Sequence, residues 1–133
     1  MISAEYAAGF FDGEGCVNIT TVGRSAQVAL RVMIVNTDAG ILEMFAATYG
    51  GRLQKPRRFR PNWKPFRSLV MVGRVAVDFL RVIQPHARLK RSQIDLALEF
   101  WEFMQLPRTA RCSVNISVHL DWRNRATVIR SAE

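Results

Sequence analysis

Two glycines four residues apart, Gly9 and Gly13, constrain this chain more than any other feature of its sequence. In a helix, residues separated by four lie on one face, and glycine leaves no Cβ there to hold a neighbouring helix away. Gly15 then ends the helix. Glu14 precedes that stop, where a helix carries a partial negative charge and unpaired carbonyl groups. A carboxylate is unfavourable there unless a cation joins it, so the stretch predicts a close helix contact beside a cation site.

Residues 7–15 read Ala-Ala-Gly-Phe-Phe-Asp-Gly-Glu-Gly and resemble the LAGLIDADG motif of the homing endonucleases. Ala7 stands in place of the leading leucine, and Glu14 stands where aspartate is commoner. The resemblance implies that Glu14 binds a divalent metal, Mg²⁺ or Mn²⁺, and that two copies of this helix form a central interface. The interface residues so implied are Ala8, Gly9, Asp12 and Gly13. Without the resemblance, Asp12 and Glu14 would read as a solvated acidic turn.

A metal site at this helix end would be completed by a second chain. Hydrolysis of a phosphodiester at neutral pH needs an activated water and charge neutralisation, which bound divalent metals supply. Hard ions such as Mg²⁺ prefer carboxylate and carbonyl oxygens, and one Glu14 does not close such a site. Two chains crossing at Gly9 and Gly13 would bring two Glu14 side chains together. Asp12 is the competing ligand, but its earlier position favours a structural cap or pair.

The net charge indicates the kind of partner. The chain has 133 residues, 49% of them hydrophobic, which predicts one domain with a core of its own. Its 19 Lys and Arg outnumber 11 Asp and Glu, so the net charge is +8, typical of proteins that bind polyanions. Nucleic acid is the leading candidate partner. A ribosome-associated or merely basic soluble protein would have the same composition.

The cysteines and the apolar runs exclude several other classes. Cys16 and Cys112 are far apart and have no ligand spacing with His86 or His119, so neither a disulfide framework nor a zinc site is expected. Both thiols are consistent with the reducing interior of a cell. No apolar run has membrane-spanning length, and no basic region precedes an apolar core at the N-terminus. We therefore expect an intracellular protein without membrane contact, from a bacterial, phage or organellar setting that the sequence does not distinguish.

The periodicity of apolar residues predicts an α+β fold with the order αββαββα, in which two helices follow the last strand. Val28, Leu30, Val32 and Ile34 alternate with less apolar residues, as in a strand with one face on a core. A further helix is expected to bury Val75, Phe79, Leu80 and Ile83. The expected helices cover residues 3–13, 38–49, 75–83 and 92–104, and the expected strands cover residues 16–22, 27–35, 52–60 and 66–72.

This order agrees with the fold that the resemblance implies, an antiparallel sheet that forms a saddle on DNA with helices on its other face. The agreement extends over residues 1–106, which we interpret as the endonuclease domain. Residues 107–133 form a C-terminal tail whose structure the sequence leaves open.

Two further residues are candidates for chemistry. The segment at residues 85–93 resembles the family's proline and lysine signature before the last helix, and Lys90 matches the position whose basic side chain reaches the catalytic pocket. A lysine there can stabilise developing phosphate charge, although a solvated basic turn explains it too. Asn36 matches a polar position that orients solvent around the metals in relatives, and capping of the following helix explains it equally well. The candidate catalytic residues are Glu14, Lys90 and Asn36.

The open face of the sheet has the side chains needed to read DNA. Arginine pairs with guanine in the major groove, asparagine or glutamine pairs with adenine, and short hydroxyls adapt. The candidates on the sheet are Asn18, Thr20, Gln27, Arg31, Arg52, Gln54, Lys55 and Arg67. Arg57 and Arg58, with Arg60, Trp63 and Lys64, are expected to hold phosphates from a loop. The alternative for that loop is a solvated, charged hairpin tip.

Taken with the resemblance, these features predict a homodimeric, metal-dependent endonuclease that cleaves double-stranded DNA at a palindromic or nearly palindromic site. One alternative is the same fold retained as a DNA-binding regulator or RNA maturase without cleavage. Another is a basic structural protein whose glycine helix is only a dimer interface. The presence of both Glu14 and Lys90 favours the enzyme, because a pure binder has no need of the acid.

Overall fold

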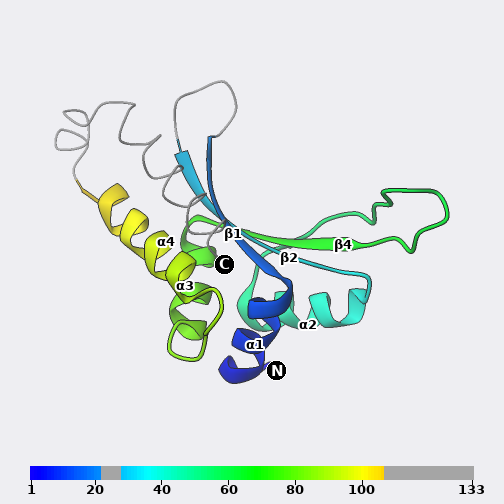
Figure 1. The fold of residues 1–133 in the computed structure, drawn as a ribbon, viewed down its shortest axis with the longest axis horizontal. Helices are drawn as coiled ribbons and strands as arrows, with labels where there is room; N and C mark the ends of the chain where they lie inside the picture. Colours follow the sequence, from blue (N-terminus) through cyan, green and yellow to red (C-terminus); the bar gives the residue numbers. More distant parts are fainter. Residues whose placement is uncertain (22–27, 107–133) are drawn as a thin grey trace.

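The computed structural model describes residues 1–21 and 28–106, which form one antiparallel sheet and the helices that cover it (Figure 1). The elements are α1 (Ala4–Glu14), β1 (Gly15–Thr21), β2 (Val28–Asn36), α2 (Ala39–Tyr49), β3 (Arg52–Leu53), β4 (Arg67–Val72), α3 (Gly73–Ile83) and α4 (Arg91–Met104). The predicted α+β class and order of elements are confirmed. The predictions for Gln27 and for residues 107–133 lie outside the described residues.

The strands lie side by side in the order β1-β2-β4-β3, and every neighbouring pair is antiparallel. Gly15 pairs with Ile34, Ile34 with Leu69, and Leu69 with Leu53, so these residues form one row across the sheet. Because side chains alternate between the two faces of a strand, this register assigns every neighbouring residue to a face.

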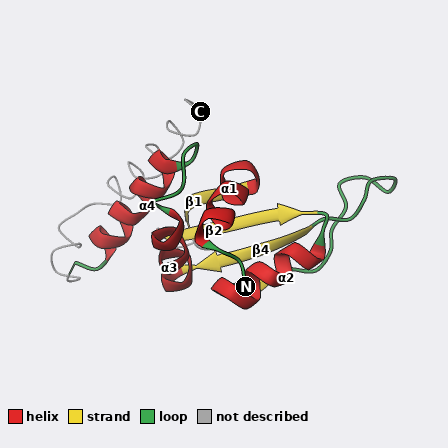
Figure 2. Ribbon diagram, turned by 90° about the horizontal axis from the view of Figure 1, so that it is seen from below, coloured by secondary structure: helices red, strands yellow, loops and turns green. Residues whose placement is uncertain are grey.

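The core lies between the sheet and the helices, which cover one face of it (Figure 2). Leu30, Val32 and Ile34 of β2 are buried on that face, as their alternation predicts. Phe79 of α3 meets the rings of Phe11 in α1 and Phe45 in α2, with centroids 5.7 and 6.4 Å apart. This aromatic contact fixes α1 against the two helices that flank it.

Local signals in the sequence set the ends of the first two helices. The Ser3 hydroxyl accepts a hydrogen bond from the Tyr6 amide at 3.2 Å and caps α1. Asp38 caps α2 in the same way, because its carboxylate accepts from the Ile41 amide at 3.2 Å. Gly50 ends α2 with a positive φ of 86°, a conformation that favours glycine. The ends of α1 and α2 lie within a residue of those predicted, residues 3–13 and 38–49.

A hydrogen bond from α2 holds the start of the chain in place. The Tyr49 hydroxyl donates to the Ile2 carbonyl at 2.7 Å. Burial raises the pKa of Tyr49, and the negative charge of Glu5 adds to the effect. The hydroxyl therefore stays protonated and able to donate at neutral pH, which fixes the residues that lead into α1.

The third strand is much shorter than predicted. Instead of residues 52–60, β3 contains only Arg52 and Leu53. Pairing continues as one hydrogen bond from the Gln54 amide to the Ser68 carbonyl at 2.8 Å, and then as an isolated pairing of Arg57 with Phe66. One extra residue lies between these pairings on the β3 side, next to Pro56. Proline has no N–H to donate, so the ladder is interrupted there.

The buried stripe of α3 differs from the prediction at its first member. Val75 is 40% exposed, whereas Ala76 is fully buried. Ala76, Phe79, Leu80 and Ile83 have the spacing i, i+3, i+4, i+7 of a single helical face. The expected stripe therefore had the right last three members and the wrong first one, because helical geometry places Val75 on the flank.

Candidate active site and nucleic-acid interface

Glu14 stands at the junction where α1 passes directly into β1. It is exposed, and among the described residues its carboxylate has no hydrogen-bond or ion-pair partner. The residue after it must be glycine, because a Cβ at Gly15 would overlap the buried ring of Phe11. The Gly15 amide donates to the Phe11 carbonyl, which closes the last helical turn. The packing of Phe11 thus requires glycine directly after Glu14, where α1 ends. Glu14 lies unpaired at this negative end of the helix dipole.

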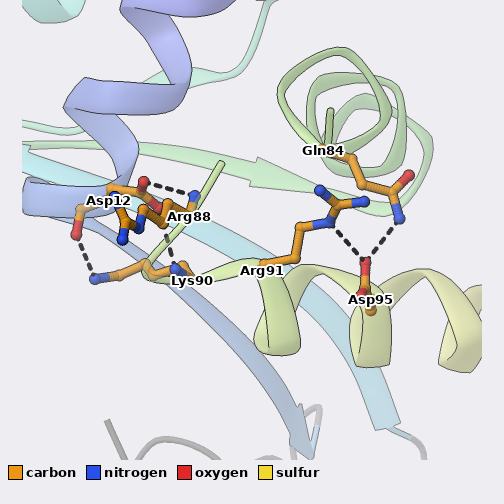
Figure 3. A network of polar contacts seen from close by, with 6 residues as sticks. All are labelled: Asp12, Gln84, Arg88, Lys90, Arg91 and Asp95. Atoms are coloured by element: carbon orange, nitrogen blue, oxygen red, sulfur yellow. Dashed lines mark hydrogen bonds and ion pairs between the residues drawn. The ribbon is translucent and has the colours of Figure 1, made fainter. Parts of the chain in front are cut away.

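Asp12 joins the end of α1 to the loop between α3 and α4 (Figure 3). One carboxylate oxygen accepts a hydrogen bond from the Arg88 amide at 2.9 Å, and the other accepts from the Lys90 amide at 3.1 Å. Both oxygens are therefore used within the protomer. This agrees with a structural role for Asp12 and counts against its being a direct metal ligand.

Lys90 lies at the same helix end as Glu14. Its ammonium group donates to the main-chain carbonyl of Asp12, with Nζ 3.0 Å from the oxygen (Figure 3). Asp12 and Lys90 are 78 residues apart in sequence, so only the fold brings the lysine to the carbonyl end of α1. A cation there also interacts favourably with the helix dipole. The arrangement therefore serves stability and places a positive charge at the helix end that carries Glu14.

The structure gives Asn36 a capping contact. Its side-chain oxygen accepts from the Asp38 amide at 2.8 Å, which turns the chain from β2 into α2. The pairing of Gly15 with Ile34 brings this end of β2 beside the junction of α1 and β1. The capping explanation of Asn36 thus has its hydrogen bond, and its role in orienting solvent stays a prediction.

The face of the sheet away from the core carries most of the expected base-reading side chains. Asn18 lies opposite Arg31, and Thr20 lies opposite Ala29. Arg52, opposite Val70, lies on the same face, which we call the open face. The hydrogen bond from the Gln54 amide to the Ser68 carbonyl continues the same register, which places Gln54 on this face too. No helix covers this face in the ranges 1–21 and 28–106.

Arg31 lies on the open face with part of its hydrogen-bonding capacity unused. Its Nη2 is 4.0 Å from the Met33 sulfur. Its Nε is buried and has no hydrogen-bond partner in the described part of the chain. A donor without an acceptor is unfavourable when buried, so the described residues leave one hydrogen-bonding group of Arg31 unsatisfied.

Arg67 does not lie on the open face, contrary to the prediction. Register places it with Leu69 and Met71 on the helix side. There its Nε donates to the Gln54 carbonyl at 2.9 Å, and its Nη1 lies 3.8 Å from the Glu43 carboxylate of α2. Arg67 therefore connects α2 to the edge of the sheet. Lys55 is exposed just beyond β3, outside the regular ladder.

Residues 54–66 form a long connection between β3 and β4, here called the hairpin arm, which projects beyond the sheet (Figure 1). The basic residues expected to hold phosphates are exposed along it: Arg57, Arg58, Arg60 and Lys64. Arg58 donates from Nη1 to the Pro61 carbonyl at 3.1 Å, which shapes the tip. The arm thus extends positive charge outward from the edge of the sheet.

Solved structures share this architecture. The homing endonuclease I-CvuI, solved in complex with a DNA target, has a TM-score of 0.75 and 24% identity, over 95% of this chain and 80% of that one. The archaeal intron-encoded homing endonuclease I-Vdi141I, complexed with DNA, has a TM-score of 0.71 and 15% identity, over 98% and 83%. The homing endonuclease I-TnaI has a TM-score of 0.64 and 19% identity, over 96% and 98%.

This chain has the LAGLIDADG homing-endonuclease fold. The resemblance found in residues 7–15 is thereby confirmed at the level of the fold. A scan against family models and a search of curated proteins found no match. None of the helices in the described ranges has the length and apolar character needed to cross a membrane.

One residue of the expected dimer interface is unavailable in this homing-endonuclease fold. Ala8 is fully buried in the core of the protomer, because α1 packs that side toward the sheet and α3. Gly9 and Gly13 are exposed, and a Cβ built on either would meet nothing within 4 Å. The glycine face of α1 is therefore open, and Ala8 is not part of it.

The described residues of one chain do not form a complete metal site. In residues 1–21 and 28–106, no group of three His, Cys, Asp or Glu side chains gathers to hold a metal. Glu14 nevertheless offers a free carboxylate, the oxygen ligand that Mg²⁺ and Mn²⁺ accept, next to the carbonyl end of α1. The chemistry of this carboxylate fits such an ion.

Replacing Asp12 by alanine should lower the free energy of unfolding by about 1 to 2 kcal/mol, measured by urea denaturation. The change removes the acceptors for the Arg88 and Lys90 amides. Hydrogen bonds to a charged group are among the stronger ones, and partial exposure places this site low in their range.

Asp95 offers a matched control in the same region (Figure 3). Its carboxylate accepts from the Gln84 amide nitrogen at 2.8 Å and lies 3.8 Å from Nε of Arg91, with both contacts exposed. Asp95→Ala should cost less than about 1 kcal/mol. If Asp12→Ala is no more harmful than this control, Asp12 does not anchor the loop.

Proposed function

We propose that this protein is a sequence-specific, metal-dependent endonuclease that cleaves double-stranded DNA as a homodimer. The observation that carries the proposal is the free carboxylate of Glu14 at the end of α1, with the Lys90 ammonium at the same helix end. An exposed acid at the negative end of a helix is unfavourable by itself and becomes favourable with a cation. The homing-endonuclease fold supports this reading.

In the proposed site, Glu14 of each protomer holds a divalent cation, Mg²⁺ or Mn²⁺, which when bound provides an activated water and neutralises phosphate charge. Lys90 is positioned to offset charge that develops on the phosphate. Asp12 keeps Lys90 at the helix end through the amides of its loop. The open Gly9 and Gly13 face supports a close crossing of two α1 helices, which would bring the two Glu14 residues together.

The same proposal assigns separate tasks to the two basic surfaces. Asn18 and Arg31 on the open face have side chains that pair with adenine and guanine in the major groove. The exposed arginines of the hairpin arm are suited to phosphates, which fix register but carry no sequence information. A protein with this task works where DNA is stored, so we propose an intracellular location.

Two arginine substitutions should separate these tasks. Arg31→Ala should relax base preference at one position of each half-site, because a good base contact gives about 1 to 3 kcal/mol of discrimination. Arg58→Ala should weaken binding to all sequences alike and reduce the salt slope by about one. Binding selections on a duplex library at several salt concentrations measure both. Equal, sequence-independent effects from the two changes would contradict the division.

Incubation of a randomised duplex library with the protein tests the function itself. Mg²⁺ should give strand breaks at a preferred, nearly palindromic site, and EDTA should abolish them. Specific binding without breaks under every divalent metal would instead support the alternative of a DNA-binding regulator. Preference for a structured RNA would support a maturase.

A further inference from the structure

The hairpin arm carries an aromatic cluster of the exposed Phe59 and Trp63 and the half-buried Phe66, whose stacked rings have no part in the proposed cleavage. Phe59 stacks on Phe66, with ring centroids 4.8 Å apart and an angle of 22° between the planes. Trp63 meets Phe59 edge-on at 6.4 Å. Phe59 is 78% exposed and Trp63 is 49% exposed. Rings that stay in water contribute little to folding, so this cluster is suited to a partner.

The charges around the rings select an anionic partner. The Arg60 guanidinium lies over the Trp63 ring, 5.2 Å from its centroid. Further exposed cations follow along the arm: Arg57, Arg58 and Lys64. The sequence contains no acidic residue between Glu43 and Asp78. The surface therefore combines flat aromatic faces with positive charge that no nearby acid in this stretch of sequence offsets.

A stacked ring pair among cations fits an unpaired nucleotide better than a base pair. In a duplex, neighbouring bases cover one another's faces and present only their edges in the grooves. An unpaired base can stack on an aromatic side chain while basic residues hold its phosphates. Phe66 and Phe59 already form two layers of such a stack, and the exposed surface of Phe59 leaves room for a base as the next layer.

We propose that the aromatic cluster binds single-stranded DNA with little sequence preference, as a binding activity distinct from cleavage. The proposal depends on the proposed function only in the choice of DNA over RNA. Stacking provides affinity without reading base edges, because every base has an aromatic face. Arg60 and its basic neighbours would bind the backbone phosphates on either side of the stacked base.

Fluorescence anisotropy of the full chain in EDTA tests the proposal without cleavage. The probes are a labelled single strand of about 12 nucleotides, within the usual site size, and a duplex of the same sequence, both lacking the target site. Phe59→Ala should weaken binding of the single strand about tenfold, as expected for the loss of one stacked base, and change duplex binding less than about twofold. Phe59→Tyr keeps the aromatic face and should bind like the unaltered chain.

Val82→Ala is a matched control, because it shortens another exposed apolar side chain, on α3, and should change neither affinity. Unchanged binding of the single strand by Phe59→Ala would overturn the proposal. So would an equal loss on strand and duplex, which would mean that the rings contact paired DNA, or tighter binding of an RNA of the same sequence. Since EDTA prevents cleavage in every sample, failure here is independent of failure of the endonuclease.

Discussion

Replacing Glu14 by glutamine should lower strand cleavage at least about a hundredfold while DNA affinity stays within a few-fold. The amide keeps the size of the side chain but lacks the negative charge with which a carboxylate binds a hard cation. Loss of metal assistance costs several kcal/mol of transition-state stabilisation, and each 1.36 kcal/mol is a factor of ten in rate. The phosphate and base contacts lie elsewhere, on the open face and the hairpin arm, so binding should persist.

The structure makes this substitution easy to interpret. Glu14 is exposed and has no partner among the described residues, so Glu14→Gln should not reduce the free energy of unfolding. It removes a negative charge from the negative end of α1, which is slightly favourable. Glu102→Gln is a matched control, because Glu102 is also exposed and lies in the last turn of α4. Cleavage at the normal rate by Glu14→Gln, measured on a target duplex with Mg²⁺, would refute the metal assignment.

Gly9→Val should abolish dimerisation and cleavage together and leave a folded protomer. In the single chain, a Cβ at Gly9 meets nothing within 4 Å, and its φ is not positive, so valine fits there without strain. Valine is also a somewhat better helix former than glycine. In a dimer that crosses at this face, a branched side chain from each protomer would separate the two backbones. Overpacking of this kind costs about 1 to 3 kcal/mol for each insertion.

Sedimentation velocity and cleavage of a palindromic target measure the two losses on the same samples. Ala47→Val is the control, because it adds the same branched side chain at an exposed position of α2. That variant should dimerise and cleave normally. A Gly9→Val dimer of normal affinity would contradict the interface. A wild-type monomer that cuts both strands of a non-palindromic site would exclude the shared active site altogether.

Features that depend on neighbouring residues could be predicted from the sequence. The caps at Ser3 and Asp38 form hydrogen bonds over three residues, and the alternation along β2 needs only the period of a strand. The open glycine face of α1 follows from a spacing of four. These local rules also identified Glu14 as an acid at a helix end, and the resemblance over residues 7–15 linked it to a known fold.

Errors arose where a residue's face or partner depends on distant segments. Arg67 was expected on the open face, but pairing with β2 fixes the register of β4 and turns Arg67 toward α2. Because the side-chain period is two, one residue of register decides between the faces. Ala8 was expected at an interface, but the packing of α1 on its own protomer buries it. Strand pairing around Pro56 shortened β3 for a similar reason.

The sequence by itself determined the order of the elements, the caps of α1 and α2, the open glycine face and the acid at the end of α1, because each depends on residues close together in the chain. Only the tertiary structure decided that the Asp12 carboxylate binds the loop of Arg88 and Lys90, and that the Lys90 ammonium reaches the same helix end. It alone also brought Phe59, Trp63 and Phe66 together on an exposed arm. Such contacts join distant residues or depend on the path of a loop, and no periodicity encodes them.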